Sequence, residues 1–171
     1  MSVPKHVKAK NGQDGALLFM LCAIAVYAID QVCKAMVFTN MMLYESIPLI
    51  PGFFHLTFIM NSGASFGILK DWTYLFIATS SAVVLFIVWI VFFWKGIDRA
   101  SKILMGFIAG GALGNLTDRL RFGAVVDFLD FRGIWSYIFN TADIAVVCGG
   151  FMLALLILFD EWQAGNIKPR H

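Results

Sequence analysis

The sequence predicts an all-α integral membrane protein with four transmembrane helices and a small strand-rich cap on its extracytoplasmic face. Hydrophobic residues make up 60% of the 171 residues, and charged residues make up only 14%. An ordinary soluble domain is about 45–50% apolar and about 25% charged. The net charge of +2 is too small and too scattered to favour a nucleic-acid partner. We therefore expect residues 1–171 to form a single membrane domain.

Four stretches are long and apolar enough to cross a bilayer, which requires roughly 20 mostly apolar residues. Lipid cannot satisfy exposed backbone N–H and C=O groups, so each stretch should be a helix. The second stretch carries no charge, whereas the third is shorter and rich in glycine, which lets helices approach closely. The predicted spans are about residues 15–36, 73–94, 101–117 and 141–159.

The distribution of lysine and arginine predicts the orientation of these helices. Basic residues precede the first span, join the second to the third and follow the fourth. The positive-inside rule therefore places both termini and the 95–102 loop in the cytoplasm. Segments 37–72 and 118–140 then share the extracytoplasmic face. The residues that set this orientation are Lys5, Lys8, Lys10, Lys95, Arg99, Lys102, Lys168 and Arg170.

Segment 44–69 differs in character from the spans. Pro48, Pro51 and Gly52 interrupt it, and the stretch HLTFIM has the β-branched and aromatic composition of short strands. We expect a strand-rich cap here. Segment 121–139 resembles a second piece at the membrane interface, because it contains aromatic residues suited to headgroup depth.

Asp30 and Lys34 are four positions apart near the outer end of the first span, so they share one helix face. An acid placed four residues before a base is the favourable order for an ion pair, and this pair is expected to brace the site. Asn61 precedes Ser62-Gly63. It is either a turn residue or a side chain that presents its amide to an extended peptide.

Asp118 follows the third span, with three arginines after it on the same predicted face. The last turn of a helix favours cations, so Asp118 needs a partner, and Arg119 or Arg121 can supply it. Arg119, Arg121 and Arg132 all lie on the extracytoplasmic side, against the positive-inside trend. Their position indicates a task beyond topology, and Arg119 or Arg121 could hold a carbonyl group or a lipid headgroup.

Asp127 and Asp143 are sixteen positions apart, and the chain between them leaves and re-enters the outer face. Such a loop can bring two carboxyls together, and two carboxyls in a partly dry pocket share a proton. The pair can then activate water and protonate a leaving group. The alternative is that each aspartate caps a helix or meets an arginine. Asn140 or Thr141 can cap the fourth helix.

Other chemistries have weaker support in the sequence. His6, His55 and His171 do not have the spacing of a zinc site, so we expect no metal and no cofactor. No serine lies in a nucleophile-elbow pattern. A proton-coupled transporter or channel subunit would place its acids near the bilayer centre, facing a through-path. An assembly factor with charged loops would tolerate the loss of one aspartate.

Five motifs, in order along the chain, resemble those of the lipoprotein signal peptidases, also called signal peptidase II. Any one of them is weak evidence, but all five occur in register. The resemblance extends from about residue 15 to about residue 160. The motifs are DQVCK at 30–34, NSGASF at 61–66, GGALGNLTDR at 110–119, VVDF at 125–128 and FNTAD at 139–143.

This resemblance implies an aspartyl endopeptidase of the bacterial inner membrane, with Asp127 and Asp143 as its catalytic pair. Such an enzyme cuts prolipoproteins just before the diacylglyceryl-modified cysteine and releases the signal peptide. Its expected partners are prolipoproteins, membrane lipids and the cyclic peptide inhibitor globomycin. The charges near the predicted membrane surface would then serve catalysis, because the cleavage site lies at that depth.

The resemblance also implies roles for further residues. It implies a strand-rich cradle at 44–69 and a short outer helix near 128–137, both over the active site. Ser65 departs from the family, in which many members have alanine. The residues expected to line the pocket are Asn61, Asn115, Arg119 and Asn140, and those expected to support it are Asp30, Lys34 and Asp118.

Overall fold

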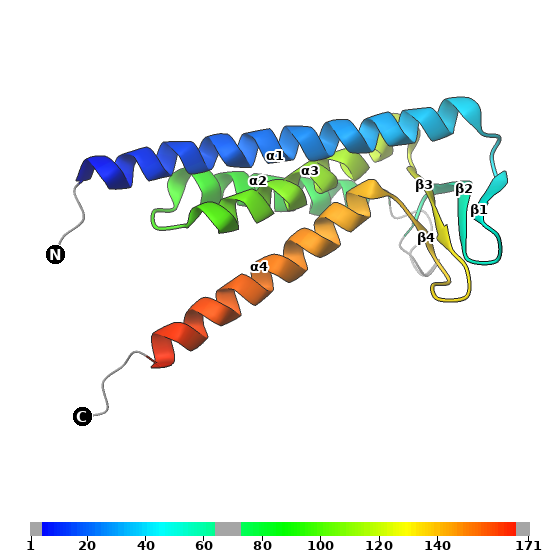
Figure 1. Cartoon of the computed structure of the whole chain (residues 1–171). Coiled ribbons are helices and arrows are strands. Elements are labelled where there is room, and N and C mark those ends of the chain that lie inside the picture. The colour runs from blue at the N-terminus through cyan, green and yellow to red at the C-terminus, as the bar shows by residue number, and fades with distance from the viewer. Residues whose placement is uncertain (1–4, 64–72, 167–171) are drawn as a thin grey trace.

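The computed structural model describes residues 5–63 and 73–166, which form four helices and one antiparallel sheet (Figure 1). Helices α1, α3 and α4 contain the predicted spans and extend beyond them, whereas α2 ends one residue before the predicted end of the second span. The bounds are α1 Lys5–Asn40, β1 Ser46–Ile50, β2 Phe54–Asn61, α2 Thr73–Phe93, α3 Arg99–Phe122, β3 Val125–Phe131, β4 Ile138–Phe139 and α4 Thr141–Asn166.

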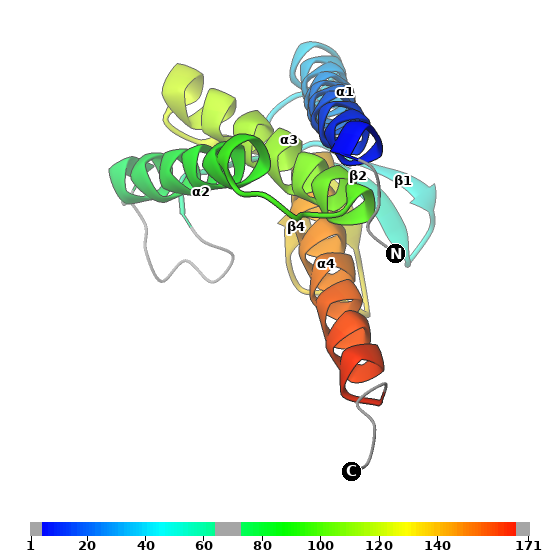
Figure 2. The same ribbon diagram turned by 90° about the vertical axis from the view of Figure 1, so that its left-hand side faces the viewer.

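Helix α3 lies at the centre of the helical part. It packs against α1, α2 and α4. Helices α2 and α4 extend away from α3 in different directions (Figure 2). Within the described residues, three helical segments are long and apolar enough to cross a membrane, and α3 is not among them. Three neighbouring helices cover α3, and its glycines and Asp118 are buried among them. The three segments are Asp14–Asn40, Thr73–Phe93 and Thr141–Gln163.

Glycines let the helices pack on α3 at backbone distance. A Cβ added to Gly110 would lie 2.5 Å from the carbonyl oxygen of Ala23 in α1. One added to Gly111 would lie 2.5 Å from the carbonyl oxygen of Ala142 in α4. Neither separation leaves room for a methyl group. The glycines of the third predicted span therefore act in packing, as such residues do in membrane helices.

The sheet has the strand order β1-β2-β3-β4, with each neighbouring pair antiparallel. A buried cluster fixes it to the end of α1 and consists of Val37, Phe58, Val126 and Phe128. Strands β1 and β2 lie in the segment expected to be strand-rich. Residues 64–72, which include Ser65, lie outside the described part of the chain.

The prediction of a short helix near residues 128–137 is wrong. Strand β3 runs through Phe131, a turn follows, and β4 returns at Ile138. The strand forms because its backbone pairs with β2 on one side and β4 on the other, and its valines and phenylalanines suit a strand. Gly133 has φ of 81°, a left-handed conformation that suits glycine and permits the turn.

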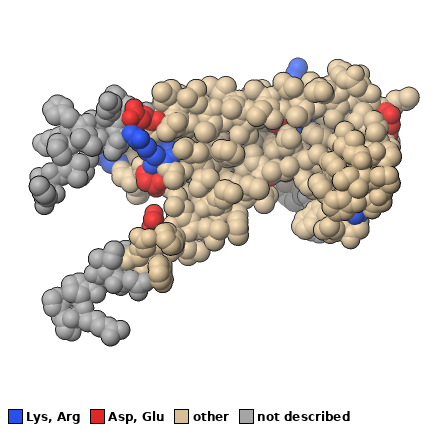
Figure 3. Space-filling model, in the orientation of Figure 1, with Lys and Arg blue, Asp and Glu red and all other residues tan. Residues whose placement is uncertain are grey.

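The molecule has two distinct ends. The sheet lies at one end, whereas the start of α1, the end of α4 and the α2–α3 loop lie at the other (Figure 1). In Figure 3, charged side chains gather at that second end, where Arg99 and Asp14 form an ion pair at 2.9 Å. The surface between the ends is largely uncharged in this view. This distribution fits a bundle whose middle lies in lipid.

Candidate active site

The start of α4 is fixed by a reciprocal pair of hydrogen bonds between Asn140 and Asp143. Asn140 Oδ1 accepts from the backbone N–H of Asp143 at 3.0 Å, and Asp143 Oδ2 accepts from the backbone N–H of Asn140 at 3.2 Å. This is the geometry of a capping box, with Asn140 at the N-cap. Of the two caps proposed from sequence, Asn140 is therefore the one used. The box also holds the Asp143 carboxyl in one orientation.

Asp127 lies on β3 and is 2% exposed. Its Oδ1 accepts from Asn140 Nδ2 at 2.6 Å, and its Oδ2 accepts from Asn61 Nδ2 at 2.8 Å. Asn61 Oδ1 also accepts from the backbone N–H of Gly63 at 3.1 Å. The Gly63 contact confirms the turn expected from sequence, and the amide nitrogen of Asn61 binds the Asp127 carboxyl.

Asn115 of α3 completes the link between the two acids. Its Nδ2 donates to Asp143 Oδ1 at 2.7 Å, and its Oδ1 accepts from Asn140 Nδ2 at 3.1 Å. Asn140 is fully buried and contacts Asp127, Asn115 and Asp143. The structure thus joins both predicted catalytic acids in one hydrogen-bond network, although they are distant in sequence.

Burial raises the pKa of Asp127 to about 7, and the nearby charge of Asp143 adds to this effect. The hydrogen bonds from Asn61 and Asn140 act in the opposite direction, because they stabilise the ionised carboxylate. At neutral pH this carboxyl is therefore close to the midpoint of its titration. A group with this pKa can both accept and donate a proton under physiological conditions.

Beside the two acids lies a buried ion cluster centred on Lys34. Its Nζ is 2.9 Å from Asp30 Oδ2 and 3.0 Å from Asp118 Oδ2, and it donates to Asn115 Oδ1 at 2.8 Å. The expected pair between Asp30 and Lys34 therefore forms. All three donors of the ammonium group are used, as burial of a charge requires.

The partner assigned to Asp118 from sequence was wrong. Lys34 pairs with it, rather than Arg119 or Arg121. Asp118 is 1% exposed on the side of α3 that faces α1, and Lys34 lies on α1, far away in sequence. Arg121 is exposed, and Arg119 lies over the ring of Phe76 at 5.0 Å.

The ion cluster also binds the backbone next to each acid. Asp118 Oδ2 accepts from the N–H of Val126, the residue before Asp127, at 3.1 Å. Asp30 Oδ1 accepts from the N–H of Ala142, the residue before Asp143, at 2.8 Å, and from the Thr141 hydroxyl at 2.7 Å. One cluster therefore positions the two segments that carry the acids.

Gln31 is a member of this cluster that the sequence reasoning missed. Its Nε2 lies 3.3 Å from Asp30 Oδ2, 3.2 Å from Asp118 Oδ1 and 3.3 Å from the carbonyl oxygen of Gly114. The amide thus separates two like charges and joins α1 to α3. Its position next to Asp30, as an uncharged polar residue inside an apolar span, was the signal available.

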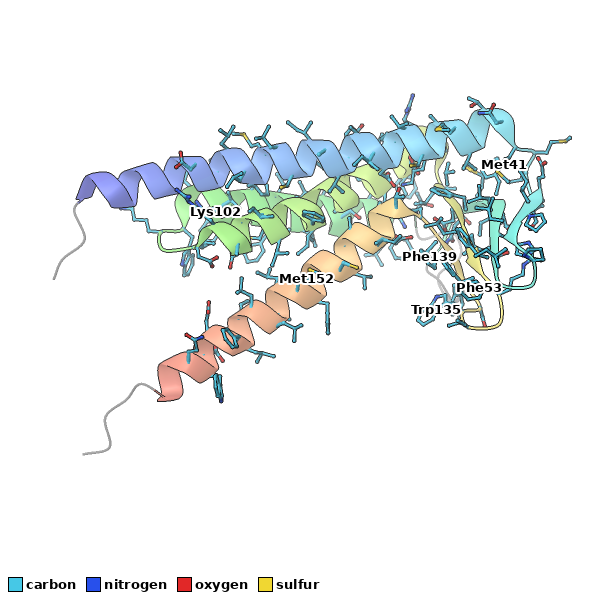
Figure 4. The ribbon with its side chains drawn as sticks, in the orientation of Figure 1. Met41, Phe53, Lys102, Trp135, Phe139 and Met152 are labelled. Carbon is cyan, nitrogen blue, oxygen red and sulfur yellow. The ribbon has the colours of Figure 1, made fainter. Side chains whose placement is uncertain are left out.

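A largely apolar cavity of about 700 Å³ opens beside the network. Asn115, Arg119 and Asp143 line it, whereas Asp127 lies outside its lining. Trp135 and Phe139 of the β3–β4 hairpin also line it at the sheet end, while Met152 lies further along α4 (Figure 4). Among the described residues, no group of three or more His, Cys, Asp or Glu is placed to hold a metal ion.

Comparison with known proteins supports a single family. The family described as "Signal peptidase (SPase) II" matches residues 22–159. The lipoprotein signal peptidase of Halothermothrix orenii is 46% identical over 150 residues, covering 86% of this chain and 97% of the relative. That of Desulfitobacterium hafniense is 44% identical over 136 residues, covering 80% of this chain and 89% of the relative.

The fold is similar to that of solved proteins. A bacterial membrane enzyme determined by the in meso method at 2.3 Å resolution has a TM-score of 0.77 and 29% sequence identity. The match covers 90% of this chain and 93% of that enzyme. A second one, at 1.9 Å resolution, has a TM-score of 0.73 and 31% identity, covering 82% of this chain and 91% of that enzyme.

Proposed function

Because the chain belongs to the signal peptidase II family, we propose that it is an aspartyl endopeptidase that removes signal peptides from diacylglyceryl-modified prolipoproteins. The observation that carries the aspartyl mechanism is the network around Asn140, which contacts Asp127 and Asp143 together. Two carboxyls held this way suit a shared proton. The bond cut is the one before the lipidated cysteine.

In this mechanism the pair carries one proton at working pH. The ionised carboxylate removes a proton from water as the water oxygen attacks the scissile carbonyl carbon. The protonated carboxyl donates its proton to the carbonyl oxygen. The tetrahedral intermediate then collapses, the C–N bond breaks, and the cysteine amine leaves after receiving a proton. The proton belongs to the pair as a unit rather than to one aspartate.

The remaining residues of the site bind the substrate or hold the two acids in position. Asn115 and Arg119 line the cavity, where they can contact the substrate backbone or globomycin. Asn61 and Asn140 hold Asp127. Because Asp127 is 2% exposed and outside the cavity lining, substrate binding must open a path for water to it. The supporting cluster consists of Asp30, Gln31, Lys34 and Asp118.

The proposed placement is a single four-span domain in the bacterial inner membrane, with α3 as the shielded span. Both termini lie in the cytoplasm, and the sheet and the two acids lie at the outer face. The two-ended structure and the basic residues support this orientation (Figures 1 and 3). The partners are then prolipoproteins and membrane lipids, because the acyl chains of the substrate remain in the outer leaflet.

A transporter or channel has less support. The network of acids lies at the sheet end of the helices, rather than midway along them as a proton path requires. An experiment distinguishes a protease from a non-enzymatic assembly factor. The test is cleavage of a synthetic diacylglyceryl-modified prolipoprotein peptide by the purified protein, with and without globomycin, followed by mass spectrometry. Absence of a product cut before the modified cysteine would refute the proposal.

A further inference from the structure

The cavity has an outer end close to the sheet and an inner part. At the outer end, Asn115, Arg119 and Asp143 lie beside aromatic side chains of the β3–β4 hairpin. The inner part lies further along the helices, where α2, α3 and α4 each contribute aliphatic side chains. Those side chains include Val83, Ile108 and Val147. A substrate that reaches the acids must therefore place part of its structure in apolar surroundings.

Ser80 of α2 lines this cavity about two helical turns from Thr73, the residue at which α2 begins. No group in residues 5–63 or 73–166 forms a hydrogen bond with its hydroxyl. Thr79 also lines the cavity, but its hydroxyl donates to the carbonyl oxygen of Leu75 at 2.9 Å. Ser80 thus differs from its neighbour, because its donor is available to an occupant of the cavity.

We propose that Ser80 is a substrate-binding residue that donates a hydrogen bond to a carbonyl oxygen of the substrate inside the cavity. The inference rests on the proposed function, because that function brings a substrate with carbonyl groups into the cavity. A polar group buried without a partner costs free energy, so a carbonyl that enters the apolar part needs a donor. Ser80 supplies a donor that stays available when the cavity excludes water.

Two parts of the substrate carry a suitable carbonyl. One is the peptide backbone near the scissile bond, which must be extended for cleavage and so lacks helical hydrogen bonds. The other is an ester of the diacylglyceryl group. Both are neutral oxygen acceptors, and Ser80 would recognise the same chemistry in either.

The test compares the steady-state kinetics of Ser80→Ala with those of the wild-type protein on a diacylglyceryl-modified peptide. Loss of one neutral hydrogen bond is expected to raise KM about threefold to tenfold. The value of kcat should stay near that of the wild type, because the bond is made in both the ground state and the transition state. Ser81→Ala is the matched control, since Ser81 is also on α2 but outside the cavity lining.

A second substrate, in which ether-linked alkyl chains replace the ester-linked acyl chains, distinguishes the two carbonyls. If Ser80 binds an ester, its substitution raises KM only for the ester substrate. If it binds the peptide, KM rises equally for both. An unchanged KM for both substrates, or a fall in kcat alone, would overturn the assignment of Ser80. A wild-type protein that cleaves neither substrate would instead refute the proposed function.

Discussion

Asn140 Nδ2 donates to Asp127 Oδ1 at 2.6 Å, so the residue that caps α4 also holds an acid on β3. The two functions of Asn140 use different atoms. Its Oδ1 accepts from the N–H of Asp143, which stabilises the helix, whereas its Nδ2 orients the Asp127 carboxyl. The capping function and the proposed function of orienting Asp127 can therefore be separated by substitution.

Asn140→Ser keeps an oxygen that can cap α4 but removes the donor to Asp127. We expect kcat to fall by about tenfold to a hundredfold, while the cap itself loses little stability. Asn140→Ala removes both functions, and loss of the cap should cost a further ~1 kcal/mol of unfolding free energy. Thermal unfolding and cleavage kinetics of the two variants measure these effects. Equal kcat for Asn140→Ser and the wild type would rule out the orienting function.

Asp127→Asn and Asp143→Asn should each abolish cleavage while the protein remains folded. Residues that act as a unit in catalysis are strongly non-additive, so each single change should lower kcat by about 10⁴-fold or more. Asp160→Asn is the matched control, because Asp160 is exposed near the other end of α4. Substantial turnover by either purified variant would remove that aspartate from the catalytic pair.

The pH dependence of kcat/KM should have a limb near pH 7. Burial and the charge of Asp143 raise the pKa of Asp127 to about 7, so the pair loses its shared proton as the pH rises through that value. The general acid is then lost, and kcat/KM should fall about tenfold for each further pH unit. A pH–rate profile of the purified enzyme measures this. A constant kcat/KM from pH 6 to pH 9 would contradict the assigned titration.

The same raised pKa has a consequence for stability. The Asp127 carboxyl binds its proton more tightly in the folded than in the unfolded protein, so the free energy of unfolding should decrease as pH rises from about 4 to about 7. In Asp127→Asn this contribution is absent. The melting temperature of the variant relative to wild type should therefore be higher at pH 8 than at pH 5. A pH-independent difference would indicate that Asp127 titrates at its ordinary pKa.

Asp30→Asn should lower stability more than activity. The change breaks a fully buried ion pair with Lys34 and weakens the contact to the Ala142 N–H. Lys34 keeps its ion pair with Asp118, so the expected loss is that of weakened buried hydrogen bonds, about 1–3 kcal/mol of unfolding free energy. Thermal unfolding in detergent, compared with kcat measured well below the melting temperature, separates the two effects. A large loss of kcat with an unchanged melting temperature would contradict the bracing function.

Gly114→Ala tests the close approach of α1 and α3. A Cβ at this position would collide with the Asp30 carboxylate, so the buried cluster must move and the melting temperature should fall. Gly150→Ala is the matched control, because a Cβ there meets no heavy atom within 4 Å. Alanine is a better helix former than glycine by about 0.5–1 kcal/mol, so the control should be neutral or slightly stabilising. Equal effects of the two changes would argue against the tight contact.

Hydropathy along the chain located the helical spans, because the length and apolar character of a span are local properties. The start of α4 could also be predicted from the sequence, because Asn140 lies three residues before an acid, in the order of a capping box. The pairing of Asp30 with Lys34 followed from the periodicity of a single helix. In each case the interacting residues are close in sequence.

Only the tertiary structure decided which distant residues meet. It gave Asp118 its partner on α1, identified Gln31 as the amide between two carboxylates, and placed Asn140 against Asp127. It also made a strand of Val125–Phe131, because the hydrogen bonds of a strand come from its neighbours in the sheet. Such pairings depend on how helices pack and strands align, and neither is encoded in a local pattern. The sequence therefore determined which residues could act, and the packing of α1, α3, α4 and the sheet determined which of them act together.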